Sequence, residues 1–302
     1  MMNKVKLFIY ILFYFIIILF FLLYKKLKKS LYMKTIVITG SSSGIGKESA
    51  KLFSSKGWTV IATMRKPEEE KELTNLKNVY LYALDITNIE QVKRTSEEIL
   101  KNFDVDVLFN NAGYGMKFRF EDMTEEIIKN SLDTNISGMV RVTQQFIPHF
   151  KKKKSGIILT TTSLAGEIGL VLDGVYSADK WALTGISEML YYELAPFNIQ
   201  VKTLVPGVVK TGFISRMNRV KEIPEEYKDI IDKQLKFIIP DYNEIESAIE
   251  AANDAYNAVT DGDKDRMCYI TGKVAKEILE KREKMGNENF RKYFKNYLLG
   301  NQ

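Results

Sequence analysis

The sequence predicts an α/β protein in which one doubly wound parallel β-sheet of six or seven strands carries helices on both faces, behind one transmembrane helix. Three observations predict it: an apolar run near the N-terminus, short β-branched runs that alternate with amphipathic stretches from Lys34 onward, and a glycine-rich turn after the first of those runs. A chain of 302 residues suffices for one such domain. We expect an anchor with its basic flank over residues 1–33 and a single folded domain over residues 34–302.

The predicted anchor is the run of 18 apolar and aromatic residues from Leu7 to Tyr24. At about 1.5 Å per residue it measures roughly 27 Å, close to a bilayer core of about 30 Å. No small-x-small cleavage site follows it, which favours an anchor over a cleaved signal peptide. Four lysines follow the run directly and two precede it, so the positive-inside rule predicts a single-pass membrane protein whose folded domain is cytoplasmic.

The charge distribution argues against a nucleic-acid partner. The net charge is +6, but residues 1–34 hold seven lysines and no acid, which leaves 37 basic and 38 acidic residues for the rest of the chain. Basic residues beside an apolar span are attracted to anionic lipid headgroups, whereas nucleic-acid binders carry such charge on the folded domain. The single cysteine, Cys268, has no partner for a disulfide, and no set of Cys and His predicts a metal site.

The alternation from Lys34 onward predicts the strands, and helical periodicity fills the gaps between them. Ligands of a doubly wound sheet bind beyond the carboxyl ends of its strands, so the chemistry is expected in the loops there. The charged segment 208–243, with two prolines, fits neither strand nor helix and is expected to form a substrate lid, and one or two helices follow Thr271. The expected strands are Lys34 to Thr39, Trp58 to Thr63, Val79 to Ala83, Val105 to Asn110, Gly156 to Thr162, Gln200 to Val205 and Met267 to Thr271.

The glycine-rich turn indicates a dinucleotide. It reads Thr39-Gly40-Ser41-Ser42-Ser43-Gly44-Ile45-Gly46 and precedes a predicted helix, whose free N–H groups can hold a pyrophosphate. The same residues match the G-x-S-x-G elbow of serine hydrolases with Ser42 as nucleophile, but the one histidine, His149, is a surface residue of a predicted helix. A P-loop is set aside because Glu48 stands where Ser or Thr is required.

The end of the second strand distinguishes NADP from NAD. NAD sites usually offer a carboxylate there to the ribose hydroxyls, but this strand ends Ala62-Thr63-Met64-Arg65. The guanidinium of Arg65 can pair with a 2′-phosphate. The sequence therefore favours NADP(H), and NAD(H) stays open.

Tyr176 and Lys180 form a proton-transfer pair. Four residues apart in a predicted helix, they lie on one face, where the ammonium is expected to lower the pKa of the phenol. Ser163 lies just after the strand Gly156 to Thr162, and Asn110-Asn111-Ala112-Gly113 closes an earlier strand. Side chains at these strand ends are expected to meet at the cofactor.

With these motifs, residues 34–271 resemble the short-chain dehydrogenase/reductase family, in particular hydroxysteroid and retinol dehydrogenase-like members, with a Rossmann-type fold. The resemblance implies that Tyr176 is the catalytic acid/base, Ser163 binds the reacting oxygen of the substrate, Lys180 binds the nicotinamide ribose and Asn135 supports a proton-relay water. It also implies a cofactor site made of Thr39, Gly40, Ser42, Ser43, Gly44, Ile45, Gly46, Arg65, Asp85, Asn111, Ala112, Gly113, Tyr176, Lys180, Pro206, Gly207, Val209 and Thr211.

These expectations combine into a membrane-anchored NADP(H)-dependent oxidoreductase. It would interconvert an alcohol and a carbonyl on a lipophilic substrate such as a steroid, retinoid or acyl chain. The resemblance also implies a homodimer or homotetramer through helices around residues 124–150 and 176–196. Two other functions stay open: a membrane-tethered NADPH-binding sensor without turnover, and a serine hydrolase.

Overall fold

The computed structural model describes residues 6, 13–18, 20, 33–213, 217–219 and 223–300. The chain separates into two units, residues 1–34 and 35–302, and each is considered by itself. The predicted span over residues 7–24 lies largely outside the described residues. Within the described residues, no helix has both the length and the apolar character that crossing a bilayer requires.

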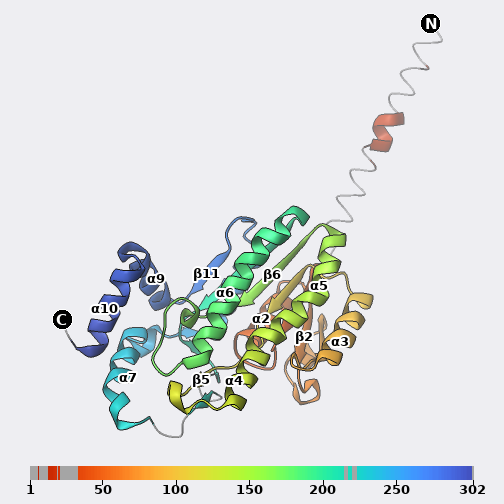
Figure 1. The fold of residues 1–302 in the computed structure, drawn as a ribbon. Coiled ribbons are helices and arrows are strands. Elements are labelled where there is room, and N and C mark those ends of the chain that lie inside the picture. Colours follow the sequence, from red (N-terminus) through yellow and green to blue (C-terminus); the bar gives the residue numbers. More distant parts are fainter. Residues whose placement is uncertain are drawn as a thin grey trace. The chain divides into compact units, whose positions relative to one another are not determined.

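One parallel sheet of seven strands organises the second unit (Figure 1). Its order is β11-β7-β6-β4-β1-β2-β3, and every pairing is parallel. All seven predicted strands are confirmed, with ends that shift by one or two residues. The strands are β1 Thr35–Thr39, β2 Thr59–Met64, β3 Val79–Ala83, β4 Val107–Asn110, β6 Gly156–Thr161, β7 Ile199–Pro206 and β11 Cys268–Thr271.

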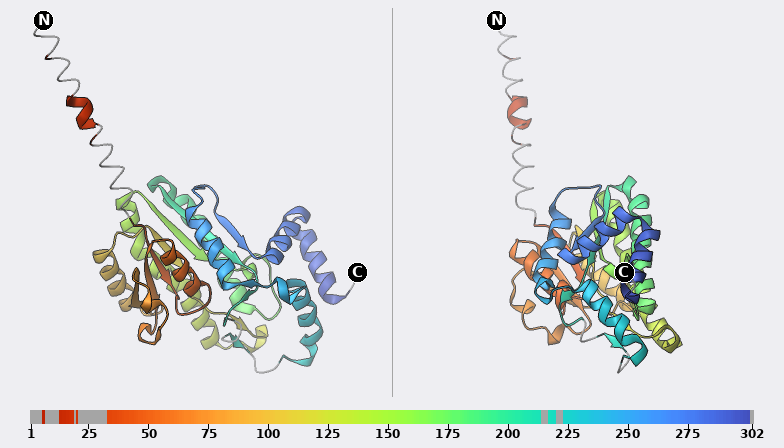
Figure 2. Two further views of the ribbon diagram at one scale, coloured as in Figure 1. Left: turned by 180° about the vertical axis from the view of Figure 1, so that it is seen from behind. Right: turned by 90° about the vertical axis from the view of Figure 1, so that its left-hand side faces the viewer.

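Helices cover both faces of the sheet (Figures 1 and 2). Successive residues of a strand point to opposite faces, so Ile36 and Ile38 pack under α2 Gly44–Ser55 and α8 Ala248–Thr260. Val37 packs on the other side, against α3 Ile89–Asn102, α5 Met139–Lys153 and the end of α6 Gly174–Leu194. Fully buried parallel strands explain the continuous apolar runs in the sequence.

The strand order reverses between β1 and β4. From β1 the chain steps outward through β2 and β3, then returns to β4 and steps outward on the other side through β6, β7 and β11. Loops after β1 and β4 therefore diverge and leave a crevice at their carboxyl ends, the usual ligand site of such sheets. The Rossmann-type α/β fold is confirmed.

The expectation that residues 208–243 contain no regular structure was wrong for α7 Glu225–Ile238. Pro224 precedes this helix, Glu225 and Glu226 lie in its first turn, and Ile231, Gln234 and Ile238 form its buried side. The many charged residues that obscured the pattern lie on its exposed side. Two short parallel pairs flank the segment: β5 Met116–Lys117 with β9 Asn218–Arg219, and β8 Val209–Lys210 with β10 Glu246–Ser247.

Two terminal helices follow the sheet, as predicted. They are α9 Lys273–Met285 and α10 Asn287–Leu299, and Phe294 of α10 packs on Phe237 of α7 with ring centroids 4.7 Å apart. On the other side, α4 Glu125–Leu132 continues through a π-helical turn, Asp133–Gly138, into α5. Short 3₁₀ turns occupy Pro67–Glu69, Leu73–Asn75, Phe120–Asp122, Leu164–Gly166, Ala195–Phe197 and Tyr242–Glu244.

Candidate active site

The turn between β1 and α2 leaves no room for a side chain at Gly40 or Gly46. Gly40 and Gly44 have φ angles of 70° and 57°, a region that favours glycine. A Cβ on Gly40 would lie 2.8 Å from the Cα of Ala112, and one on Gly46 would lie 2.5 Å from the Gly40 carbonyl oxygen. Helix α2 begins at Gly44, so the unpaired N–H groups of its first turn lie next to these glycines and can hold a pyrophosphate.

The glycine turn is fixed to the loop after β4 by hydrogen bonds. The Thr39 hydroxyl oxygen accepts the backbone N–H groups of Asn111 and Ala112, both at 3.0 Å. The Asn111 side-chain amide donates to the Thr39 carbonyl at 3.1 Å. These contacts join the two loops that border the crevice, where the sequence predicted a cofactor site.

A third loop approaches the same turn from β7. Its Thr211 lies so near Gly44 that a Cβ on Gly44 would be 3.4 Å from the threonine methyl carbon. Gly207 is also confined, since a Cβ there would lie 2.9 Å from the Cβ of Ala275. The predicted residues Pro206, Gly207, Val209 and Thr211 thus belong to a segment whose end reaches the glycine turn.

Asn135 connects the loop after β4 to helix α6. Its side chain lies in the π-helical turn, where its Oδ1 accepts the N–H of Tyr114 and its Nδ2 donates to the Tyr114 carbonyl, each at 3.0 Å. A Cβ on Gly113 would lie 3.0 Å from Asn135 Oδ1 and 3.9 Å from Lys180 Nζ. Single π turns of this kind recur at functional sites. Gly113, Asn135 and Lys180 are therefore neighbours.

Tyr176, Ser163 and Lys180 converge as the sequence predicted. The Ser163 hydroxyl lies close enough to the Tyr176 phenol to lower its pKa. Lys180 Nζ lies 5.7 Å from the centroid of the Tyr176 ring and donates to the Thr161 carbonyl at 3.0 Å. Helix α6 supplies the tyrosine and lysine, and the segment directly after β6 supplies the serine, so a phenol, a hydroxyl and an ammonium lie beside one strand end.

The expected lowering of the Tyr176 pKa by Lys180 was wrong for this structure. Burial raises the pKa of the Tyr176 phenol well above its usual range, the hydrogen bond from Ser163 opposes that shift, and the nearby carboxylates of Asp173 and Asp179 add to it. Burial also lowers the pKa of Lys180 to about 8, with Asp179 opposing. Desolvation outweighs charge attraction because both groups are enclosed and the ammonium donates to Thr161.

Asp179 is a site residue that the motifs missed. Its side chain is completely buried, and its Oδ2 accepts the Ser131 hydroxyl at 2.5 Å and the Asn135 amide at 2.8 Å. Burial raises the pKa of this carboxyl. An i, i+3 spacing from Tyr176 and its position directly before Lys180 were the signals that could have found it.

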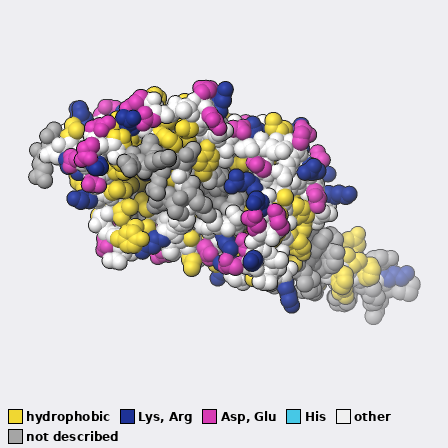
Figure 3. Space-filling model, turned by 90° about the horizontal axis from the view of Figure 1, so that it is seen from below, with side chains coloured by type: hydrophobic (Ala, Val, Ile, Leu, Met, Phe, Trp, Pro, Cys, Tyr) yellow, Lys and Arg dark blue, Asp and Glu magenta, His cyan; other side chains and the backbone are white. Residues whose placement is uncertain are grey.

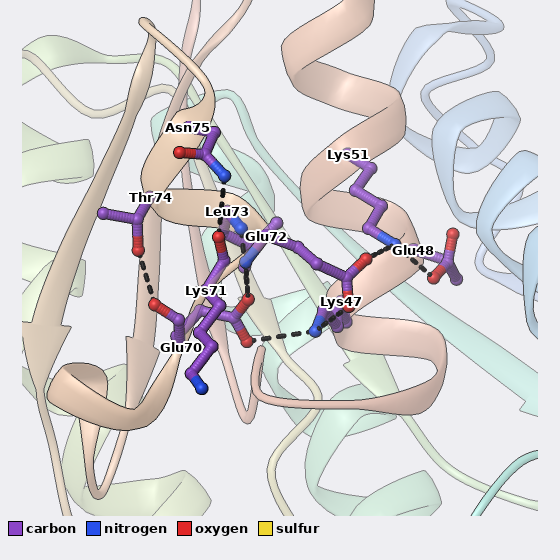
Figure 4. A network of polar contacts seen from close by, with 9 residues as sticks. All are labelled: Lys47, Glu48, Lys51, Glu70, Lys71, Glu72, Leu73, Thr74 and Asn75. Atoms are coloured by element: carbon purple, nitrogen blue, oxygen red, sulfur yellow. Dashed lines mark hydrogen bonds and ion pairs between the residues drawn. The ribbon is translucent and has the colours of Figure 1, made fainter.

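Arg65 has the surroundings of a phosphate ligand. It is exposed at the end of β2, and within the described part of the chain it forms no hydrogen bond or ion pair. Three lysines of α2 and of the loop after β2 do have acidic partners. Lys66, next in sequence, pairs with Glu69 at 2.7 Å. Lys47 and Lys51 of α2 both pair with Glu72 at 2.6 Å (Figure 4).

Asp85 lies in the loop after β3, where its Oδ1 accepts the N–H and hydroxyl of Thr87 at 2.9 and 2.7 Å. The carboxylate therefore shapes a turn here, and its implied contact with adenine stays a prediction. At the glycine turn Ser42 is exposed, Ser43 precedes α2 with extended backbone angles, and Ile45 packs against the core beneath α2.

The geometry does not bring His149 to Ser42. The imidazole Nε2 lies 2.9 Å from the carbonyl oxygen of Val105, just before β4 begins, whereas Ser42 follows the end of β1. These strands are parallel neighbours, so His149 lies near the amino ends of the strands and Ser42 near their carboxyl ends. His149 is partly buried, where the sequence predicted a surface residue. A serine hydrolase at Ser42 has no support in this arrangement.

Comparison with known proteins decides the family. Residues 34–222 match the family described as short chain dehydrogenase. The chain belongs to the short-chain dehydrogenase/reductase family. Among curated relatives, 3-ketodihydrosphingosine reductase of Bacteroides thetaiotaomicron is 37% identical over 207 residues, which are 67% of this chain and 75% of the relative. Human 17-beta-hydroxysteroid dehydrogenase type 1 is 34% identical over 208 residues, 65% of this chain and 62% of that protein.

A solved structure agrees with this assignment. The alcohol dehydrogenase of the archaeon Thermococcus sibiricus, complexed with 5-hydroxy-NADP, is 26% identical, with a TM-score of 0.66 over 81% of this chain and 98% of that one. The chain is thus an oxidoreductase of this family, and its resemblance to hydroxysteroid dehydrogenases extends to a curated member.

Proposed function

We propose that this oxidoreductase interconverts an alcohol and a carbonyl on a lipophilic substrate and prefers NADP(H). One observation carries the proposal: the Tyr176 phenol, the neighbouring Ser163 hydroxyl and the Lys180 ammonium converge at the strand ends that meet the glycine turn. A phenol and a second hydroxyl that lie side by side can both contact one substrate oxygen.

The residues divide the work of proton transfer. The nicotinamide, when bound, supplies or accepts the hydride at the carbonyl carbon. In the reductive direction Tyr176 donates its proton to the substrate oxygen, and Ser163 donates a hydrogen bond that stabilises the charge developing there. Because burial raises its pKa, the Tyr176 phenol stays protonated before the reaction. It gives up its proton when negative charge develops on the substrate oxygen, and the nearby Lys180 ammonium then stabilises the phenolate. Lys180 contributes its ammonium below about pH 8.

The residues around the crevice fit a dinucleotide phosphate. The close approaches at Gly40 and Gly46 expose backbone N–H groups for the pyrophosphate. Arg65 would bind the 2′-phosphate, because it is exposed and no carboxylate within the described residues neutralises it. The Thermococcus sibiricus relative, bound to an NADP derivative, supports the same preference.

The surroundings of Tyr176 favour a lipophilic substrate. Its ring packs in an apolar cluster with Met116, Phe118 and Ala165, and the Phe213 ring lies 6.1 Å away, centroid to centroid. Phe213 and Met217 come from the proposed lid, residues 208–243, and both reach Gly115 beside this cluster. The relatives that act on a ketodihydrosphingosine and a hydroxysteroid support a lipid alcohol or ketone.

The N-terminal run belongs to the same proposal. Residues 7–24 would anchor a single-pass protein with its catalytic domain, residues 34–302, on the cytoplasmic side. An anchored enzyme would meet its substrate dissolved in the bilayer. The proposed enzyme forms a homodimer or homotetramer through the helices around residues 124–150 and 176–196.

Turnover of a carbonyl panel tests the function. Full-length protein in detergent is incubated with NADPH or NADH and short-chain, steroid and long-chain ketones, and cofactor absorbance is followed. We expect oxidation of NADPH and a loss of about 10³-fold or more in Tyr176→Phe, with unchanged NADPH binding. Absence of turnover with every ketone, together with tight NADPH binding, would favour the tethered sensor.

A further inference from the structure

Two cavities lie on either side of one glycine. The first, of about 380 Å³, lies beside the active site because Phe118 and Leu170, which line it, pack in the same apolar cluster as Tyr176. The second, of about 410 Å³, lies between residues 167–169 and the terminal helix α10. Gly169 lines both cavities. Their volumes fall within the roughly 300–1,000 Å³ of small-molecule sites.

The second cavity has an apolar wall and a charged rim. Its wall includes Ile168, Trp181, Ile230, Phe290 and Phe294, which come from four separate parts of the chain. Trp181 is 44% exposed, so the cavity opens to the surface there. At the rim, Arg282 lies 5.4 Å from the Trp181 ring and 3.7 Å from the Glu167 carboxylate.

The segment between the cavities is held in place from both sides. Leu170 packs both in the Tyr176 cluster and in the cluster that contains the terminal helices. The next residue, Val171, exchanges two hydrogen bonds with the buried Gln234 side chain of α7, at 2.7 and 3.3 Å. At Gly169, an added Cβ would meet nothing within 4 Å. Gly169 is itself exposed, so the path between the two cavities is open to solvent on one side, and the backbone at this position does not require a glycine.

We propose that the two cavities form one open-sided channel for the apolar chain of the substrate, which passes Gly169 and ends against the terminal helix α10. This inference rests on the proposed function, and it names a long linear chain as the substrate class. A flexible alkyl chain can follow the two cavities in turn, whereas the fused rings of a steroid cannot change shape to do so. Figure 3 shows hydrophobic side chains among charged ones on the face where α4 and α7 lie.

Chain length in the substrate tests the channel. Full-length protein in nanodiscs reduces a series of linear 2-ketones of increasing length with NADPH. We expect kcat/KM to rise up to about fourfold per added methylene, equivalent to about 0.8 kcal/mol, until the channel is filled. Gly169→Trp should lower kcat/KM for the long ketones at least tenfold and leave that for the shortest ketone unchanged. Gly169→Ala, which adds only one methyl group, should resemble the wild type.

A variant at the far end covers the case in which Gly169→Trp fails to fold. Leu299 lines the second cavity and is 52% exposed, so a charge there costs little in the folded chain. Leu299→Asp should shorten the chain length at which kcat/KM stops rising. The shortest ketone again serves as the internal control.

Fluorescence detects the chain without turnover. The protein has two tryptophans, and Trp58 is buried in the core while Trp181 lines the second cavity. A long-chain alcohol with bromine atoms near its end should quench Trp181 by contact. The quenching should disappear in Trp181→Phe and weaken in Gly169→Trp.

The outcomes separate the two proposals. If no ketone is reduced but the brominated alcohol quenches Trp181, the proposed function fails and the channel stands. If short ketones are reduced but kcat/KM is independent of chain length and no quenching occurs, the channel is wrong and the function stands. Quenching that Gly169→Trp leaves unchanged would also overturn the channel, because the chain would then enter by another route.

Discussion

The cofactor side and the substrate side of the crevice are built on different principles. On the cofactor side, backbone meets backbone: the glycine turn leaves less than 3 Å for an added Cβ at Gly40 and Gly46, and Thr39 bonds directly to the loop after β4. On the substrate side, apolar side chains from α6, α7 and α10 enclose cavities. Backbone packing dictates particular residue types, whereas apolar packing accepts many combinations of similar volume. One side therefore binds a fixed ligand, and the other side determines which substrate enters.

After Tyr176→Phe, the largest expected effect comes from Ser163, where the two sides of the crevice meet. Ser163→Ala removes the hydroxyl next to Tyr176, and with it a donor to the charged oxygen in the transition state. We expect kcat to fall about 10²- to 10³-fold while the dissociation constant of NADPH stays unchanged, measured by turnover and by NADPH fluorescence. Ser55→Ala is the control, because Ser55 is an exposed helix residue. A kcat within threefold of wild type would contradict the assigned role.

A methyl group at Gly46 should damage the cofactor side alone. Its Cβ would lie 2.5 Å from both the Gly40 carbonyl oxygen and the Asn111 amide nitrogen, so the turn must open. We expect Gly46→Ala to weaken NADPH binding about 10- to 100-fold, or about 1.4–2.7 kcal/mol by calorimetry. Gly185→Ala is the matched control, since nothing lies within 4 Å of its added Cβ. Unchanged affinity would show that the turn tolerates a side chain.

The difference between the two sides also decides what the sequence could predict. Gly40, Gly44 and Gly46 sit at fixed spacing because no other residue fits, and Tyr176 and Lys180 are one helical turn apart, so these were readable. The buried strands were equally clear from their apolar runs. The cavity wall was not, because its residues come from distant segments, and nothing local marks Ile230 or Phe294 as neighbours of Trp181.

Charge effects were the least predictable from spacing. The separation of Tyr176 and Lys180 is right, but the sign of the Tyr176 pKa shift depends on burial, which no local pattern reveals. The carboxylate of Asp179 was overlooked for the same reason: only the folded chain brings Ser131 and Asn135 to it.

Arg65 tests cofactor choice within the cofactor side. Arg65→Met removes a cation at the end of β2 that has no acidic partner within the described residues. We expect kcat/KM for NADPH to fall about tenfold or more and that for NADH to stay the same. Lys66→Met is the control, because Lys66 already pairs with Glu69. Equal losses with both cofactors would indicate a structural role for Arg65 instead.

Asp179→Asn should shift the pH dependence of NADPH affinity and change kcat less than Ser163→Ala does. The Asp179 charge raises the pKa of Lys180, which burial lowers to about 8, so its removal should lower that pKa further. The ammonium would then be lost at a lower pH, and the alkaline limb of NADPH affinity should move toward neutral pH. Fluorescence titration at several pH values measures this shift. An alkaline limb at the wild-type position would contradict the electrostatic coupling.

The smallest effect is expected at the ion pairs that join α2 to residues 66–75. Glu72 pairs with Lys47 and Lys51, and these hydrogen bonds lower its pKa to about 2 from 4.5. Because its pKa is lower in the folded state, ionised Glu72 stabilises the fold above about pH 4.5, and this stabilisation is lost as the pH falls toward 2. Glu72→Gln should therefore lower Tm slightly at pH 7, less at high salt, and not at all near pH 2. In this variant Lys47 still forms its ion pair with Glu70 at 3.2 Å, so NADPH affinity should hardly change. If neither high salt nor acid removes the loss of Tm, the role of Glu72 is packing rather than charge.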